Sequence, residues 1–195
     1  MVTAQPDPHW RAQETRQRVL KMAVLMKSSA DGGAASSQLR GTTPAQSVET
    51  FLALLQDRLP MWLRVLHDLM HLAGKGDVNG NLLPVAKAGI EYYAEVQTVA
   101  MPAFVSPSLT VRFRQALRDS ELGPAAEIEP LAAYLAAEQA LGRIAPEVNA
   151  EASARLLLAG CFRHAYFEAF TGDDSEPSRD ESAENIIREL RLTRS

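Results

Sequence analysis

Residues 130–170 read PLAAYLAAEQALGRIAPEVNAEASARLLLAGCFRHAYFEAF and carry the strongest helical pattern of the chain. Apolar residues recur there at spacings of three and four, which is the period of an α-helix that buries one face. Gly142 suits the left-handed conformation that ends a helix, and Pro146 and Asn149 are typical of the start of the next one. We therefore predict one helix ending near residue 141 and a second, strongly apolar helix ending near residue 171.

The same spacing continues from this stretch toward both ends of the chain, and no run of β-branched residues alternates as a strand would. Glycines and asparagines in GKGDVNGN, residues 74–81, interrupt it. Further helices are expected over residues 10–27, 44–73, 83–104, 109–117 and 178–192, with Pro60 as a point where the second of these can bend. The predicted fold class is all-α, a bundle of about seven or eight helices.

Composition limits what this bundle can be. A chain of 195 residues with 46% hydrophobic residues can bury one sizeable core. Its longest apolar runs span only a few residues, so no membrane span is expected. The opening MVTAQPDPHW does not have the pattern of a secretory signal, and we expect a cytoplasmic protein. The net charge of −4 gives the whole molecule no attraction for a phosphate backbone.

Residues 28–43, SSADGGAASSQLRGTT, contain a single large apolar residue and are rich in Ser, Gly and Ala. Such a segment cannot hold a packed element, so we interpret it as a linker. Thr43 and Pro44 then form a good helix start. The predicted organisation is an N-terminal helix with its linker over residues 1–43 and a main domain over residues 44–195.

The stretch at 130–170 resembles the ligand-binding domain of TetR/AcrR-type regulators. In that family a "xGRL" phrase is followed by "P-x-x-(D/N)-x-x-x-A-x-x-LLxGxxxxxxF", and the matching positions here are Gly142, Arg143, Ile144, Pro146, Asn149, Ala154, Leu157, Leu158, Gly160 and Phe167. Residues 14–26, ETRQRVLKMAVLM, are similar to the first helix of the same family. The resemblance implies a helical body that binds a small molecule and forms a homodimer.

The resemblance breaks after this first helix. Regulators of this type continue with about twenty-five residues that form two helices, the second of which enters the major groove. Residues 28–43 cannot supply these two helices. We therefore expect that the helix-turn-helix is absent and that the chain does not bind nucleic acid on its own.

The resemblance also implies that the last two long helices pair with those of a second copy, and their apolar and small residues suit such an interface. The residues expected there are Ala154, Leu157, Leu158, Cys161, Ala165, Ile186, Ile187 and Leu190. The alternative is that the two helices only close the core of a monomer.

The resemblance implies a ligand pocket among the middle helices, whose soft and aromatic side chains suit a small apolar or aromatic ligand. The candidate ligand-binding residues are Trp62, Leu66, His67, Met70, His71, Tyr92, Tyr93, Met101 and Phe104. Packing of the core would use the same residue types. Because no glycine-rich phosphate loop and no CxxC motif appears, we expect no cofactor.

Two groups of reactive side chains share helical faces. His67 and His71 stand one turn apart in HDLMH and could hold a metal from two sides, or simply be polar side chains at a rim. Cys161, His164 and Glu168 could form a relay of thiol, imidazole and carboxylate, although the cysteine also reads as a small buried hydrophobe. No resident metal is assigned to either group.

Three functions remain open from the sequence. The first is a TetR-like, small-molecule-binding regulator that has lost autonomous DNA binding. The second is an enzyme of small-molecule metabolism built in the same pocket, with catalytic residues drawn from His67, His71, Tyr93, Glu91 and Glu95. The third is a conventional repressor from which the DNA-reading segment has been deleted.

Overall fold

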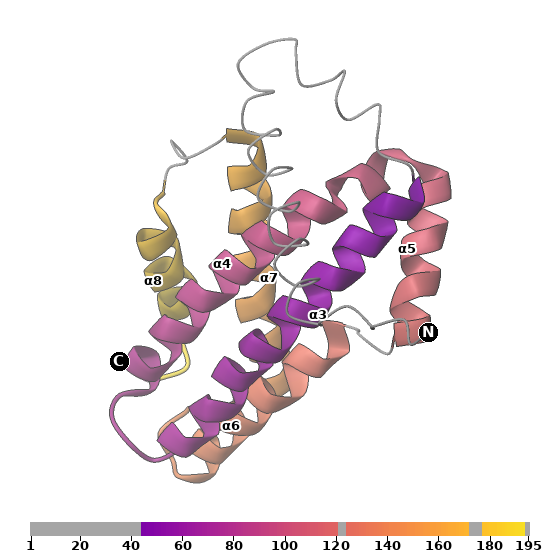
Figure 1. The fold of residues 1–195 in the computed structure, drawn as a ribbon. Helices are drawn as coiled ribbons and strands as arrows, with labels where there is room; N and C mark the ends of the chain where they lie inside the picture. The colour runs from indigo at the N-terminus through magenta and orange to yellow at the C-terminus, as the bar shows by residue number, and fades with distance from the viewer. Residues whose placement is uncertain (1–43, 121–123, 172–176, 194–195) are drawn as a thin grey trace, which may run out of the picture. The chain divides into compact units, whose positions relative to one another are not determined.

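The computed structural model of this chain describes residues 44–120, 124–171 and 177–193 (Figure 1). Its elements in chain order are the helix α3 (Pro44–Leu69), the short 3-10 helix η1 (Met70–Leu72), α4 (Val78–Val105), α5 (Pro107–Ser120), the 3-10 helix η2 (Pro124–Glu127), α6 (Ile128–Ala140), α7 (Ala150–Thr171) and α8 (Arg179–Glu189). These described ranges contain no strand, which confirms the all-α class. The expected helix at 10–27 and the linker at 28–43 lie outside them, so the count of seven or eight helices stays a prediction.

Local signals in the sequence explain where several helices begin and end. α3 begins at Pro44, as expected, and continues through Pro60, whose ring removes one backbone hydrogen bond from the helix. Gly142 has a φ of 74°, the left-handed conformation predicted after α6. The Asn149 side chain accepts a hydrogen bond from the backbone N–H of Ala152 at 2.9 Å and so caps α7.

α4 begins five residues earlier than the sequence pattern indicated, at Val78 rather than at residue 83. The Asp77 carboxylate accepts a 2.7 Å hydrogen bond from the backbone N–H of Gly80, which caps the first turn. This cap allows Asn79, Gly80 and Asn81 to be helical although these residue types favour turns. The interruption is therefore shorter than GKGDVNGN suggested, and Gly74 and Gly76 supply its positive φ angles of 77° and 58°.

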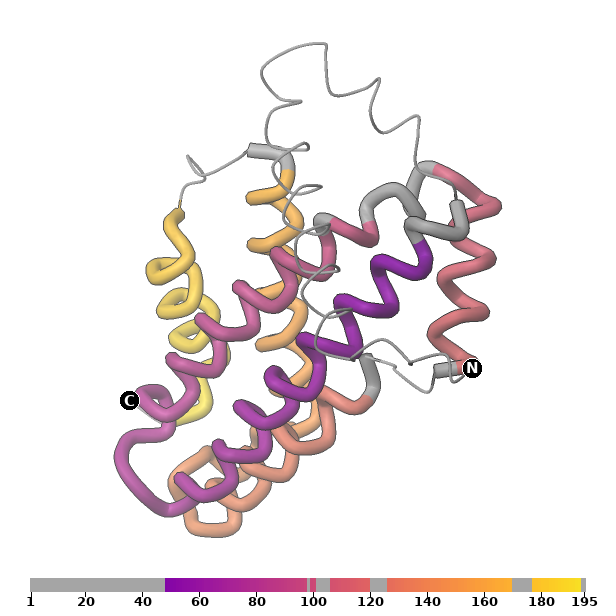
Figure 2. Tube along the Cα trace, in the orientation of Figure 1, coloured from indigo at the N-terminus to yellow at the C-terminus, as the bar shows by residue number. Residues whose placement is uncertain are grey.

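The chain divides into two compact units, and the division crosses α3 at Pro60 and α4 after Gln97. The described part of the first unit consists of residues 44–59 and 98–120, which Figure 2 allows the reader to follow along the chain. Its buried side chains include Phe51 and Phe113, whose ring centroids lie 4.6 Å apart. This ring pair joins α3 to α5.

The second unit contains the rest of α3 and α4 together with α6, α7 and α8. Within it α6 packs against α7, and α7 packs against α8. Large side chains with almost no exposed surface form its core: Leu66, Leu82, Ile90, Leu131, Tyr134, Leu135, Leu157 and Leu192. Each such burial contributes about 2 kcal/mol of hydrophobic stabilisation, and this core positions the site described below.

Small residues let helices of the second unit approach closely. A Cβ added at Gly160 of α7 would lie 2.9 Å from Cγ1 of Ile186 on α8. A Cβ added at Gly89 of α4 would lie 3.2 Å from the Trp62 ring and 3.4 Å from the Cys161 sulfur. Glycine at position 89 therefore brings α3 and α7 together on α4.

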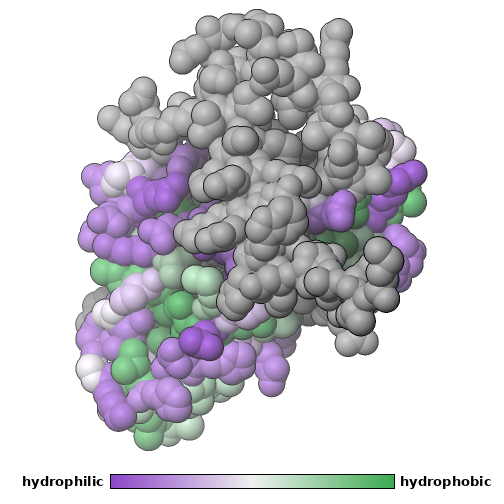
Figure 3. All heavy atoms as spheres, in the orientation of Figure 1, coloured by the Kyte–Doolittle hydropathy of each residue, from purple (hydrophilic) through white to green (hydrophobic). Residues whose placement is uncertain are grey.

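Hydrophobic residues also reach the surface, as the green areas among hydrophilic ones in Figure 3 show for the face drawn. Large exposed apolar residues of the second unit include Met61, Leu141, Leu156, Phe162 and Phe167. None of the described helices combines the length and the apolar character that crossing a membrane requires.

Candidate functional site

The second unit buries a carboxylate among aromatic rings, and we call this group the aromatic–carboxylate cluster. Its members come from α3, α4, η2 and α7: Trp62, Tyr92, Tyr93, Glu127 and Phe162. Tyr92 and Tyr93 lie on the inward side of α4, next to the exposed Glu91. The cluster gathers four aromatic rings in a chain that is only 6% aromatic.

The rings form a continuous series. Trp62 and Tyr92 stack with centroids 5.7 Å apart and an interplanar angle of 18°. Tyr92 and Tyr93 lie 5.2 Å apart, and Tyr93 meets Phe162 edge-on at 5.6 Å. Such pairs are worth about 1 kcal/mol each beyond their burial, so the series links α3, α4 and α7.

Glu127, the last residue of η2, is 3% exposed and accepts a short hydrogen bond from the Tyr93 hydroxyl. Burial raises the pKa of the Glu127 carboxyl above its ordinary 4.5, while the Tyr93 hydroxyl and the Trp62 indole N–H act to lower it. The buried indole N–H has no hydrogen-bond partner among the described residues, and it acts on the carboxylate as an electrostatic neighbour. Burial and the adjacent carboxylate raise the pKa of Tyr93, which keeps its hydroxyl a donor.

Gln97 lies one turn after Tyr93 on α4 and is 2% exposed. Its amide nitrogen donates a 2.9 Å hydrogen bond to the backbone carbonyl of Phe162. Its amide oxygen is buried and has no hydrogen-bond partner in the described part of the chain. Buried polar atoms are normally paired, so this oxygen is an acceptor left open beside the cluster.

The candidate ligand-binding residues separate into groups in the structure. Trp62, Tyr92 and Tyr93 are brought together in the cluster, and Leu66 is buried one turn beyond Trp62. His67, Met70 and His71 are exposed instead. Met101 and Phe104 belong to α4, but their side chains lie outside the described part of the structure.

Sequence reasoning missed Glu127, Gln97 and Phe162. The signal available for Glu127 was a single acid in the otherwise apolar run Pro124–Ile128, and a single acid is more often exposed. Gln97 stands four residues after Tyr93, on the face that carries the aromatic pair. No local pattern indicates that Phe162 meets Tyr93, because that contact joins α7 to α4.

His67 and His71 do not share one regular helix, since α3 ends at Leu69 and His71 lies in η1. The His67 ring nitrogen Nδ1 lies 2.6 Å from the Leu63 carbonyl of its own helix. Within the described residues, no group of three or more His, Cys, Asp and Glu side chains is arranged to hold a metal ion.

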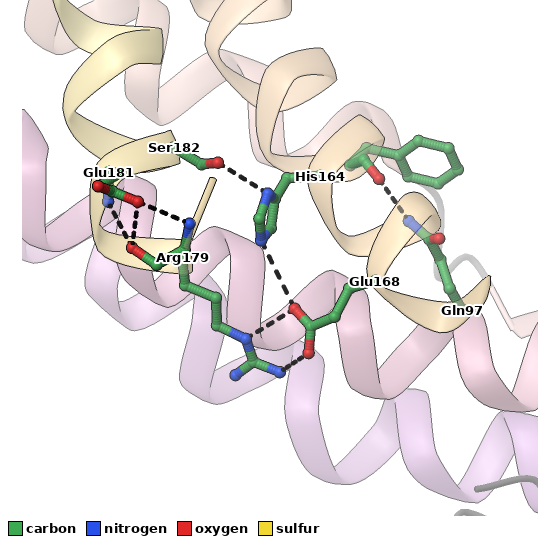
Figure 4. A network of polar contacts seen from close by, with 8 residues as sticks. Gln97, His164, Glu168, Arg179, Glu181 and Ser182 are labelled. Atoms are coloured by element: carbon green, nitrogen blue, oxygen red, sulfur yellow. Dashed lines mark hydrogen bonds and ion pairs between the residues drawn. The ribbon is translucent and has the colours of Figure 1, made fainter. Parts of the chain in front are cut away.

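A second polar group links α7 to α8, and Figure 4 shows His164 between Ser182 and Glu168. The His164 Nδ1 lies 2.8 Å from the Ser182 hydroxyl, and its Nε2 lies 3.6 Å from the Glu168 carboxylate. Glu168 also accepts two hydrogen bonds from the Arg179 guanidinium, of which the Nε contact measures 2.8 Å. Burial lowers the pKa of His164 below its ordinary 6.5, so the neutral imidazole is favoured.

Cys161 is not a member of this network. Its sulfur donates a hydrogen bond to the Ala86 carbonyl at 3.4 Å, and burial raises the pKa of the thiol to about 12. A nucleophilic cysteine needs a lowered pKa and some exposure, and Cys161 has neither. The structure thus brings His164 and Glu168 together as predicted. The group that contacts the imidazole is the Ser182 hydroxyl of α8 and not the Cys161 thiol.

A hydroxyl, an imidazole and a carboxylate in series are the residue types of a hydrolytic triad. Ser182, however, is only 6% exposed, and Arg179 already binds the carboxylate. A substrate has no access to a hydroxyl enclosed between two helices. We therefore assign the network to holding α8 on α7.

The residues predicted for the dimer interface are mostly enclosed by the chain itself. Ala154, Leu157, Leu158, Cys161, Ala165 and Ile187 are buried, and Ile186 and Leu190 are partly exposed. They contribute to the core between α7 and its neighbours. The part of α7 that stays exposed carries other apolar side chains, Leu156, Phe162, Tyr166 and Phe167.

The sequence matches no family model, and no curated protein or solved structure is similar enough to serve as a relative.

Proposed function

We propose that this chain is a small-molecule-binding regulatory module with a TetR-like body that works as a homodimer and does not read DNA on its own. The observation that carries the proposal is the aromatic–carboxylate cluster. A carboxylate buried at 3% exposure costs stability, and no ion pair among the described residues offsets that cost. A raised carboxyl pKa inside an aromatic surrounding is typical of a ligand site.

The enzyme alternative draws no support from the candidate catalytic residues. His67, His71, Glu91 and Glu95 all have exposed side chains, whereas Tyr93 is buried against Glu127. General acid and base groups must lie within hydrogen-bond reach of one substrate. Four exposed side chains and one buried tyrosine do not meet this requirement. Ligand binding therefore explains the site better than catalysis does.

Native mass spectrometry of the protein purified from its host tests the proposal directly, since it reports subunit number and any retained small molecule together. We expect a dimer with a bound molecule that is lost in a Trp62→Leu variant. Met61→Leu changes the neighbouring exposed residue and should retain the molecule. Equal retention by both variants would place the ligand elsewhere.

Gel-shift measurements test the DNA part of the proposal. The purified chain should show no sequence-specific shift at physiological salt, because a groove-reading helix is not predicted. Tight, sequence-specific binding would refute this part and restore repression as the leading function.

A further inference from the structure

The described part of the second unit contains two buried glutamates, and among the described residues only one of them has a cationic partner. Glu138 is 0% exposed, and the Arg143 Nε lies 3.2 Å from its Oε2. Its Oε1 accepts a 3.2 Å hydrogen bond from the backbone N–H of Gly74. This is the usual way to bury a carboxylate, with an opposite charge and additional donors.

Glu127 is buried to nearly the same degree but has different neighbours. Its neighbours are the neutral Tyr93 hydroxyl, the neutral Trp62 indole and the ring of Tyr92. No Lys, Arg or His among the described residues forms an ion pair with it. Within the described residues, Glu127 therefore has no counterpart to the opposite charge that Glu138 receives from Arg143.

The groups that approach Glu127 are the Tyr93 hydroxyl and the Trp62 indole N–H, and the faces of the same rings would also favour a positive charge. Aromatic faces attract cations through their quadrupole, and the attraction increases when the cation is desolvated. The open amide oxygen of Gln97 adds an acceptor for an N–H donor. Carboxylate, aromatic faces and amide oxygen all select the same ligand chemistry.

Taking the proposed function as the starting point, we propose that the aromatic–carboxylate cluster binds an organic ammonium ion with an aromatic or apolar body. The charged nitrogen would pair with Glu127, and the body would lie against the rings of Trp62 and Tyr93. Phe162, at 41% exposure, is the member of the cluster that reaches the surface, so the ligand would enter beside its ring. The ligand would supply the opposite charge that no described residue provides for Glu127.

The test uses the full chain and two probes of the same size, 2-phenylethylammonium and the uncharged 2-phenylethanol. Both carry the same ring and a hydrogen-bond donor, so their difference reports the charge. Isothermal titration calorimetry at pH 7.5 should show binding of the ammonium at least tenfold tighter than binding of the alcohol. Glu127→Gln should bring the two affinities within about threefold.

Glu129→Gln is the matched control, because it removes the same charge from an exposed residue two positions away and should keep the tenfold preference. Tyr93→Phe is a second test that leaves both the carboxylate and the ring in place, and it should keep the ammonium the tighter-binding of the two probes. Circular dichroism confirms that each variant is folded.

The outcomes separate this inference from the proposed function. The inference that the ligand is a cation is overturned if the wild-type chain binds both probes equally, or if Glu127→Gln keeps the preference for the ammonium. Either result leaves the proposal of a small-molecule site in place. Absence of binding by either probe, together with no retained molecule in the native mass spectrum, overturns both.

Discussion

At the scale of single residues, Glu127 makes stability depend on pH in an unusual direction for a carboxylate. Its pKa is raised in the folded state, so folding favours the protonated form. The stabilisation is complete below the ordinary pKa of 4.5 and is lost as the pH rises through the folded value. A carboxylate paired with a cation behaves in the opposite way.

Replacing Glu127 with Gln mimics the protonated form at every pH. We expect the variant to gain stability over the wild type progressively above pH 4.5, because the amide does not have to be buried as a charge. Urea unfolding at several pH values measures the difference. Glu129→Gln serves as the control, and a Glu127→Gln effect that is independent of pH would contradict the argument.

His164 makes stability depend on pH in the direction opposite to that of Glu127. Burial lowers its pKa, with Arg179 acting in the same direction and Glu168 against it, so stability is present above pH 6.5 and is lost as the pH falls through the folded value. His164→Gln retains a hydrogen-bonding group toward Ser182 but does not titrate. The midpoint of urea unfolding should therefore depend less on pH between pH 7 and pH 5 in this variant than in the wild type. His71→Gln, an exposed histidine outside this network, should leave the wild-type slope intact.

At the scale of elements, the contact between α7 and α8 depends on the lack of a side chain at Gly160. Glycine to alanine inside a helix normally stabilises by up to about 1 kcal/mol. Here the new Cβ would stand 2.9 Å from a branched Ile186 side chain on the neighbouring helix. We expect Gly160→Ala to destabilise the protein by about 1–3 kcal/mol in urea unfolding.

A second variant separates the steric cause from any other. Ile186→Ala removes the atoms that the new methyl group would meet, so Gly160→Ala should no longer destabilise in that background. Its intrinsic helix preference should then make it stabilising. If the two changes instead add independently, the close approach of these helices is not the reason for the loss.

At the scale of the whole molecule, the proposed homodimer must use side chains that the chain leaves exposed. Leu156 and Phe167 are 63% and 49% exposed, and a separation of about three turns places them on the same side of α7. Changing both to Glu should convert dimers to monomers in light scattering while helicity is kept. The control is Leu141→Glu, a residue exposed to 59% that follows α6. A wild-type chain that is monomeric at all concentrations would refute the homodimer.

The sequence alone was sufficient for the all-α class and for most helix boundaries. These depend on apolar spacing, prolines and caps, which act within a few residues of one another, as at Pro44 and Gly142. Residue type and the family resemblance, rather than spacing, selected Trp62, Tyr92 and Tyr93. The local pattern placed the start of α4 too late, because the cap by Asp77 overrides the turn preference of the residues that follow.

Only the tertiary structure decided which of these residues form a site. Glu127 meets Tyr93 across 34 positions of sequence, and Gln97 meets Phe162 across 65. Such contacts arise when helices pack, and no local period encodes them. Packing also buried Cys161 beside Ala86 and left Ser182 to face His164, so the chemistry of these side chains was set by burial and not by residue type.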